Sequence, residues 1–406
     1  SVGGVSILFL RLASYLAEAG LARACLVDYK DGFMAQNRDR SVCSLLEYHD
    51  DLPVYIPTEA IVVFQSMTPW SIFSSLKIQD STRVVFWNCH PFNLIPLVPG
   101  FRTHMQNNAV LGNLILNSIL LPYKIVMKRF VRTLLNHRAL VFMDRENRRV
   151  TARYLGIKNL PEIFLAIPVD IRSAFPNHSA PSRDLNRDGV RVVWLGRVVD
   201  FKFHILNRAL ERMNALQPEL DVPLEVTIIG SGDFLTILQE VAHSLLNIRV
   251  QFIEGINLQQ IDTYLLENAD MVMAMGTSAL DAGQLSIPTL LLDYAYQPVD
   301  VHYRFTWLHE RDGYSLGDQI RPCHLETTAD SMLDKIQELI VQNETLRVRV
   351  RAYVENYHSL HKIGRCLMTL LLQSDCNWKH LRDARVLGRG TLYSIFARLR
   401  TLVSTR

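Results

Sequence analysis

The chain contains few of the features that mark metal-binding or secreted proteins. Its six cysteines are scattered and include no Cys-x-x-Cys pair, so the spacing typical of zinc sites is missing. The 13 histidines show no metal-ligand spacing either. Cys25 and Cys89 lie in apolar, strand-like runs, where a buried reduced thiol is the ordinary interpretation. We therefore expect no bound metal ion and a reducing compartment, the cytoplasm.

Long hydrophobic runs and a strong charge of either sign are also missing. The longest apolar run, residues 109–121, contains Asn113 and Asn117 and is shorter than the roughly 20 residues that span a bilayer. No basic region typical of a secretory signal precedes the first helix pattern. The net charge is only +3, which gives no overall field that would select nucleic acid. We expect neither a spanning helix nor a nucleic-acid partner.

Length and composition favour a globular enzyme with two domains. Apolar residues make up 49% and charged residues 20% of the chain, which fits a protein that buries a core. A length of 406 residues exceeds one ordinary core. In the first half, short apolar runs at residues 24–27, 61–64, 84–87 and 139–142 alternate with helical patterns at 6–19, 111–135 and 146–155. This alternation predicts a largely parallel sheet covered on both faces.

A polar, turn-forming segment, residues 176–189, separates the two halves as a linker. A second, more regular series follows, with strands expected at 190–195, 226–229, 250–253, 271–274 and 289–292 and helices at 204–216, 234–246 and 258–267. The pattern predicts an α/β fold with two Rossmann-like doubly wound domains, 1–175 and 190–345. Helices at 346–406 are expected to return to the first domain. Because a glycine turn that feeds a helix normally follows a strand, the first strand of the amino-terminal domain is expected to be missing from the chain.

The most informative stretch is residues 271–293, MVMAMGTSALDAGQLSIPTLLLD. It predicts a strand, a turn at Gly276, Thr277 and Ser278, and a short helix that carries Asp281. Such a turn points backbone N–H groups and the positive end of a helix dipole toward an anion. Asp281 could accept hydrogen bonds from hydroxyls of the same ligand, or serve only as a favourable charge near the start of its helix. Phosphate together with hydroxyls indicates a nucleotide sugar.

Two cations and further glycines follow other strands of the second half. Arg197 comes directly after Gly196 at the end of strand 190–195, and Lys202 follows five residues later. Ligands of doubly wound sheets bind beyond the carboxyl ends of the strands, where these cations would reach a diphosphate. The ordinary alternative is a pair of solvated loop cations. Gly230 opens a second glycine turn, which tight-turn geometry alone would explain.

Taken together, the segments GRVVDFK, IIGSGD and MGTSALDAGQLSIPTL resemble GT-B-fold glycosyltransferases of the glycogen-synthase-like, group 1 family. The resemblance covers essentially the whole chain. It implies that Arg197 and Lys202 hold the donor diphosphate, that Gly276 and its neighbours cap the phosphates, and that Asp281 holds the donor ribose. It also implies that Gly3 and Gly4 face the diphosphate across a cleft between the domains. The nucleotide sugar is then a substrate, and no separate cofactor is implied.

Two positions depart from the family's paired acidic motif. The first Glu of that motif falls on Met273, and the second acid is Asp281 rather than Glu. The family mostly retains the anomeric configuration, and retention is the outcome carried over here. Met273 also keeps open a non-catalytic nucleotide-sugar-binding protein on the same fold. A dinucleotide-dependent dehydrogenase is disfavoured because Leu235 stands where the third glycine of a GxGxxG turn belongs.

The amino-terminal half offers fewer candidates. His90 follows the strand at 84–87, where it could contact the transferring sugar or move a proton, or simply cap a loop. Asp144 follows the strand at 139–142 and needs no role beyond a helix N-cap. Basic amphipathic patterns at residues 123–138 and 391–403 fit an anionic membrane surface, although such helices more often pack on their own protein.

The sequence therefore predicts a cytoplasmic glycosyltransferase of polysaccharide biosynthesis, with contact to the cytoplasmic face of the membrane as an open alternative. It would transfer a sugar from a nucleotide-diphosphate donor to a glycan or lipid-linked glycan acceptor. Arg197, Lys202 and His90 are the candidate catalytic residues. The expected donor-binding residues are Gly3, Gly4, Gly196, Gly230, Gly276, Thr277, Ser278 and Asp281.

Overall fold

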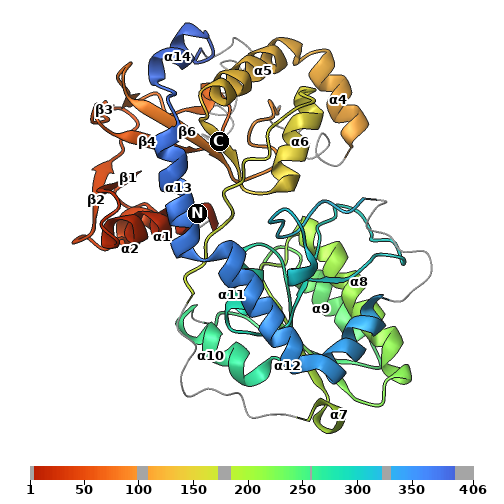
Figure 1. Cartoon of the computed structure of the whole chain (residues 1–406). Helices are drawn as coiled ribbons and strands as arrows, with labels where there is room; N and C mark the ends of the chain where they lie inside the picture. The colour runs from red at the N-terminus through yellow and green to blue at the C-terminus, as the bar shows by residue number, and fades with distance from the viewer. Residues whose placement is uncertain (1–3, 98–107, 172–183, 257, 322–330, 389–406) are drawn as a thin grey trace. The chain divides into compact units, whose positions relative to one another are not determined.

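A computed structural model describes residues 4–97, 108–171, 184–256, 258–321 and 331–388 (Figure 1). The chain forms two compact units: Ser1–Pro168 with Leu360–Arg406, and Val169–Ser359. The second unit thus begins before and ends after the range 190–345 expected from the sequence. Of the expected linker at 176–189, residues 176–183 lie outside the described residues. The remainder contains a short helix, α7 (Leu185–Asp188).

The second unit is built on one sheet, with the strand order β10-β9-β8-β11-β12-β13. Neighbouring strands from β10 to β12 are parallel, and only β13 runs antiparallel to β12. The strands are β8 (Val190–Leu195), β9 (Leu224–Ile229), β10 (Arg249–Ile253), β11 (Met271–Ala274), β12 (Thr289–Leu291) and β13 (Thr306–Trp307). The predicted parallel α/β sheet is confirmed, and β13 is a strand that the apolar runs did not indicate.

The helices of this unit owe their position to apolar stripes at helical spacing. In α8, for example, Ile205, Ala209 and Met213 are buried and join the main hydrophobic core with Trp194 of β8 and Trp307 of β13. The helices are α8 (Asp200–Leu216), α9 (Leu235–His243), α10 (Leu258–Asn268), α11 (Thr277–Gln284) and α12 (Ser331–His358), with 3₁₀ turns at Gln217–Glu219 and Leu308–Glu310.

The order of the strands fixes where a ligand can bind in this unit. From β8 the chain moves outward through β9 to β10, and then returns to place β11 and β12 on the other side of β8. The strand order therefore reverses between β8 and β11. In open α/β sheets, ligands bind outside the carboxyl ends of the strands at such a reversal.

Among its described residues, the named strands of the first unit pair in parallel, and an isolated antiparallel bridge joins Arg83 to Asn377. A three-stranded sheet has the order β4-β6-β7, and two further pairs are β1-β2 and β3-β5. The strands are β1 (Ala24–Asp28), β2 (Cys43–Glu47), β3 (Val54–Tyr55), β4 (Ile61–Gln65), β5 (Leu76–Lys77), β6 (Arg83–Asn88) and β7 (Leu140–Phe142). The expected strands at 24–27, 61–64, 84–87 and 139–142 are all found. The expectation of a missing first strand stays a prediction.

The helices of the first unit are α1 (Gly4–Glu18), α2 (Phe33–Asn37), α4 (Ala109–Asn117), α5 (Leu121–Asn136), α6 (Arg145–Leu155), α13 (Leu360–Gln373) and α14 (Trp378–Asp383), with a 3₁₀ turn at Pro69–Ser71. The single helix expected at residues 111–135 is wrong, because the chain turns at residues 118–120. Pro122 stands in the first turn of α5, where its missing N–H is tolerated. Segments 110–117 and 121–136 meet at 93°.

The carboxyl-terminal helices belong to the first unit. Gly364 of α13 packs so closely on Tyr15 of α1 that a Cβ there would lie 2.4 Å from the ring. Beyond α13, the Val84 N–H donates to the Cys376 carbonyl at 2.9 Å. The Trp378 N–H donates to the Thr82 carbonyl, also at 2.9 Å. This segment therefore bonds to the first residues of β6 and runs antiparallel to them.

Burial corrects one expectation about the cysteines. Cys89 is buried as expected, whereas the Cys25 residue in β1 is exposed, because its side chain points to the other face of that strand. In the part of the chain that the structure describes, no single helix is long and apolar enough to cross a membrane.

Candidate functional site

Arg197 and Lys202 come together at the carboxyl end of β8. Gly196 ends the strand with φ +150°, and a Cβ there would lie 3.4 Å from the Lys202 Nζ. The indole Nε1 of Trp194 donates to the Gly196 carbonyl at 3.0 Å. Lys202, in the first turn of α8, places its Nζ 5.8 Å from the centroid of the Trp194 ring. The turn thus holds the ammonium over the strand end rather than out in solvent.

The surroundings of Lys202 disfavour its charge. Burial, and then the neighbouring Arg197 guanidinium, lower the pKa of Lys202 from 10.5 to about 8. Two like charges lie close together, and one of them is partly desolvated. A bound anion would reduce the repulsion between them. A diphosphate meets that requirement, since it accepts bidentate hydrogen bonds from Arg and attracts the Lys ammonium.

This lowered pKa predicts that diphosphate affinity depends on pH. The ammonium of Lys202 loses its proton as the pH rises through about 8, and only the protonated form attracts an anion. The dissociation constant of UDP or GDP is therefore expected to rise about tenfold between pH 7 and pH 9. Isothermal titration calorimetry at several pH values measures this change. Lys202→Arg keeps its charge over the range and should abolish the dependence. Equal affinities of the parent protein at both pH values would contradict the assignment.

Gly230 and Gly232 serve a close approach between two loops. Their φ angles are +146° and +151°. A Cβ on Gly230 would lie 2.1 Å from the Gly196 carbonyl oxygen, and one on Gly232 would lie 2.2 Å from the Val198 carbonyl oxygen. The Val198 N–H donates to the Ser231 carbonyl at 2.9 Å. The glycines after β9 therefore keep the loop of Arg197 in place, which explains them without a ligand.

Gly230→Ala is expected to lower the free energy of unfolding by about 1–3 kcal/mol, because the new Cβ overlaps the Gly196 carbonyl. Gly255→Ala is the matched control. Gly255 also has a positive φ, +81°, but nothing lies within 4 Å of a Cβ there. Gly255→Ala therefore introduces backbone strain without a steric overlap. Urea denaturation of both variants measures the difference. If the two changes cost the same, the close approach of the loops has no energetic importance.

Gly276 follows the carboxyl end of β11, the strand between β8 and β12. Its φ of +68° starts α11, and its N–H donates to the Leu316 carbonyl at 2.7 Å. Because that donor is already used, the neighbours Thr277 and Ser278 are the better placed donors for a phosphate. Helix geometry leaves the N–H groups of the first turn, at Thr277 and Ser278, directed beyond the strand. Asp281 lies in the following turn of α11.

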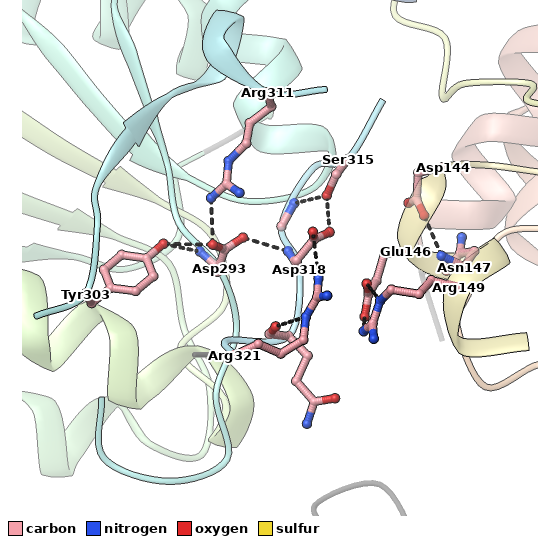
Figure 2. A network of polar contacts seen from close by, with 12 residues as sticks. Asp144, Glu146, Asn147, Arg149, Asp293, Tyr303, Arg311, Ser315, Asp318 and Arg321 are labelled. Carbon is pink, nitrogen blue, oxygen red and sulfur yellow. Dashed lines mark hydrogen bonds and ion pairs between the residues drawn. The ribbon is translucent and has the colours of Figure 1, made fainter. Parts of the chain in front are cut away.

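A buried carboxylate network supports the Gly276 turn, and the sequence reasoning missed it. Figure 2 shows Asp293 surrounded by Tyr303, Arg311 and the backbone N–H of Asp318. The Arg311 Nη2 lies 2.6 Å from the Asp293 Oδ2, and the side chains are 14% and 1% exposed. The Tyr303 hydroxyl donates to the same oxygen at 3.0 Å. Although burial disfavours the charge, the Asp293 carboxylate raises the pKa of Arg311 above its usual value.

This network fixes the loop that contacts the Gly276 turn. Asp318 donates its N–H to the Asp293 Oδ1 at 2.7 Å and accepts from the Ser315 hydroxyl. A Cβ on Gly317 would lie 2.9 Å from the Leu292 carbonyl oxygen. Leu316 lies between Ser315 and Gly317, and its carbonyl accepts the hydrogen bond from the Gly276 N–H. The available signal in the sequence was an acid, Asp293, directly after a predicted strand.

Met273 lies where the family's first Glu would stand. It is fully buried inside β11, opposite Trp194 of β8 and Leu290 of β12 in the parallel register. A carboxylate at this point of the strand would lie in the hydrophobic core, which explains why an apolar residue fits.

The candidates of the first unit lie on another compact body. His90 follows β6 and is exposed, and its Nδ1 accepts a hydrogen bond from the Phe92 N–H at 3.2 Å. The ring therefore caps its own loop, which is the structural alternative considered for it. Gly4 is the first described residue of α1, and Gly3 lies outside the described residues.

Asp144 and Glu146 have structural partners at the start of α6 (Figure 2). Asp144 accepts from the Asn147 N–H at 2.7 Å, as expected for an N-cap. Glu146 is 3% exposed and pairs bidentately with Arg149, at 2.7 and 2.5 Å. Among the described residues, no group of His, Cys, Asp and Glu side chains could hold a metal ion.

The second unit thus brings Arg197 and Lys202 together, and it places the Gly276 turn on the neighbouring strand end. Both strand ends flank the reversal of strand order between β8 and β11. Gly196 and Gly230 shape this edge of the sheet.

No protein-family model matches the chain, and no curated protein matches it either. Among solved structures, a glycosyltransferase from Rickettsia africae is similar, with 13% identity, 91% of this chain and 94% of that chain covered, and a TM-score of 0.55. WaaG, a glycosyltransferase of lipopolysaccharide biosynthesis, shares 14% identity over 91% of this chain and 96% of its own, with a TM-score of 0.49. S. aureus TarM shares 16% identity over 60% of this chain and 46% of its own, with a TM-score of 0.41.

The likeness to the Rickettsia protein over nearly the whole of both chains shows the fold. This protein has the GT-B fold of glycosyltransferases. The two-domain α/β fold that the sequence predicts is thereby confirmed.

Proposed function

We propose that the protein is a glycosyltransferase that moves a sugar from a nucleotide-diphosphate donor to a hydroxyl of a glycan or lipid-linked glycan. The observation that carries this proposal is that Arg197 and Lys202 lie close together at the reversal of strand order, beside the Gly276 turn. Cations and helix N–H groups on adjacent strand ends suit a diphosphate. The GT-B fold supports sugar transfer as the reaction.

In this proposal the chain's own residues work mainly by electrostatics. Arg197 and Lys202 bind the diphosphate and stabilise the negative charge that grows on it as the bond to the sugar breaks. Thr277 and Ser278 direct N–H groups at its oxygens. Asp281 accepts hydrogen bonds from hydroxyls of the ribose. The first unit supplies the acceptor side, where His90 is the candidate for contact with the sugar.

A donor panel tests the proposal directly. Thermal unfolding is followed with UDP-, GDP- and ADP-sugars and with the free diphosphates. A donor present at about 100 times its dissociation constant stabilises the protein by about 2.7 kcal/mol. Transfer to glycan acceptors is then assayed with the donor that binds, and the anomeric proton signals of the product test whether configuration is retained. Absence of stabilisation by every nucleotide would count against a donor site.

A non-catalytic nucleotide-sugar-binding protein is the second candidate, and Met273 favours it. The resembled family places a carboxylate at this position, and Met273 supplies none. Tight nucleotide binding with neither transfer nor donor hydrolysis would support this alternative over the first.

A further inference from the structure

Exposed apolar side chains gather where α4 and α5 meet. Between residues 110 and 125, large aliphatic side chains lie open to solvent: Val110 at 79%, Leu114 at 65%, Ile119 at 68%, Leu121 at 42% and Ile125 at 49%. We call these five residues the α4–α5 corner. Val110 and Leu114 are four residues apart on α4, and Leu121 and Ile125 are four apart on α5. Each pair therefore lies on one face of its helix.

Of these residues, only Ile125 belongs to the apolar pattern at residues 123–138 that could bind a membrane. On α5, Met127, Phe130 and Leu134 are fully buried in the core of the first unit. Phe130 and Leu134 belong to the amphipathic pattern at residues 123–138, so this part of the pattern packs on the protein itself. The corner carries aliphatic groups that the core does not use.

The corner has a fixed shape. The helical segments meet at 93°, and Leu116 and Leu120 anchor the turn in the core. Lys124, which is 6% exposed, donates its Nζ proton to the Asn117 Oδ1 at 2.7 Å and so ties α5 to the end of α4. A sharp bend anchored in this way presents the corner as a surface feature rather than as a span.

The stretch of sequence that contains the corner carries charge of one sign. Residues 81–143 contain seven Lys or Arg and no Asp or Glu. On α5, the exposed Arg129 and Arg132 follow Ile125 along the same solvent-facing stripe. Aliphatic side chains flanked by basic ones suit a surface with an apolar interior and anionic headgroups. A protein partner is less well matched, since interface centres are enriched in aromatic residues and the corner has none.

We infer that the α4–α5 corner docks the protein on an anionic lipid bilayer. Val110, Leu114, Ile119, Leu121 and Ile125 enter the boundary between headgroups and acyl chains, and Arg129 and Arg132 contact the anionic headgroups. This inference goes beyond the proposed sugar transfer and does not require it. The proposed reaction gives docking a use, because a lipid-linked acceptor would lie in the same surface.

Sedimentation of the full chain with vesicles tests the inference without any sugar-transfer assay. Binding is expected to phosphatidylcholine vesicles that contain about one-third phosphatidylserine, and to weaken with salt. Leu114→Asp with Ile125→Asp should weaken the partition by about tenfold or more, since each change removes the burial of one aliphatic side chain. Arg129→Glu with Arg132→Glu should weaken it about tenfold and remove most of the salt dependence.

The matched control is Leu246→Asp with Val341→Asp, which changes aliphatic residues that are 90% and 79% exposed but lie in the second unit. It should bind vesicles like the parent. Equal binding of the corner variant and the parent would overturn the inference, as would equal binding to vesicles without phosphatidylserine. If the aspartate variant fails to fold, the arginine variant decides by the same criterion. A parent dimer that the corner variant dissociates, without vesicle binding, would show that the face joins two copies of the chain.

Discussion

Replacing Arg197 and Lys202 together by alanine should reduce kcat/KM for sugar transfer by about 10³-fold or more. Both cations lie at the carboxyl end of β8, where the strand order reverses. In the proposed reaction they stabilise the charge that develops on the leaving diphosphate, and that charge is larger in the transition state than in the bound donor. The loss should therefore appear in kcat as well as in donor affinity. Steady-state kinetics with the donor found by thermal stabilisation measure both.

The control for this loss is a residue at the amino end of a strand in the same sheet, away from the proposed diphosphate site. Arg249 is exposed at the first position of β10, and Arg249→Ala should leave the kinetics unchanged. Circular dichroism should show the same fold for all variants, because Arg197 is exposed and Lys202 is only half-buried. Undiminished turnover in the Arg197→Ala/Lys202→Ala protein would reject the proposed diphosphate site.

Removing the Asp293 carboxylate should produce the largest loss of stability. In Asp293→Ala, the buried Arg311 guanidinium loses the carboxylate oxygen that lies 2.6 Å away. Breaking a buried ion pair by deleting one partner costs about 3–5 kcal/mol, because the remaining charge stays desolvated. For a unit of this size, the melting temperature should fall by about 10 °C. Donor affinity should fall as well, because Asp293 also fixes Asp318 and, through Leu316, the Gly276 turn.

An exposed ion pair gives the comparison. Lys379 and Asp383 lie 2.5 Å apart with side chains 57% and 52% exposed, and solvent screens such pairs. Asp383→Ala should therefore leave the melting temperature close to that of the parent. Differential scanning calorimetry on both variants measures the contrast. Similar melting temperatures for Asp293→Ala and the parent would mean that Arg311 finds another partner or moves to solvent.

Much of the fold could be predicted because local patterns determine single elements. Strands 190–195, 250–253 and 271–274 were placed within a residue of β8, β10 and β11, since each is a short apolar run between turn residues. The parallel sheet followed from the alternation of strands and helices. The break between α4 and α5 was missed, because the apolar spacing continues through the turn at residues 118–120. The short strands β3 and β5 are too brief to carry a pattern.

The candidate site was predictable only in part. Arg197, Lys202 and the Gly276 turn each follow a predicted strand, so their edge of the sheet could be inferred. Gly230 illustrates the limit: its sequence fits a ligand-binding turn, yet the structure uses it for the close approach to Gly196. The Gly276 N–H donates to Leu316, forty residues away along the chain, and a contact at that separation leaves no local signal.

By itself, the sequence determined which segments form strands and helices and which strand ends carry cations and glycines, because spacing, turn residues and apolar runs act locally. Tertiary structure decided which of those ends became neighbours and which charges met. The order β10-β9-β8-β11-β12-β13 brings the ends of β8 and β11 together, and the loop after β12 returns to bury Asp293 with Arg311. The same packing left the aliphatic side chains of the α4–α5 corner exposed. The burial of a side chain depends on every element that packs around it, whereas a pattern in the sequence reports only on the element in which it occurs.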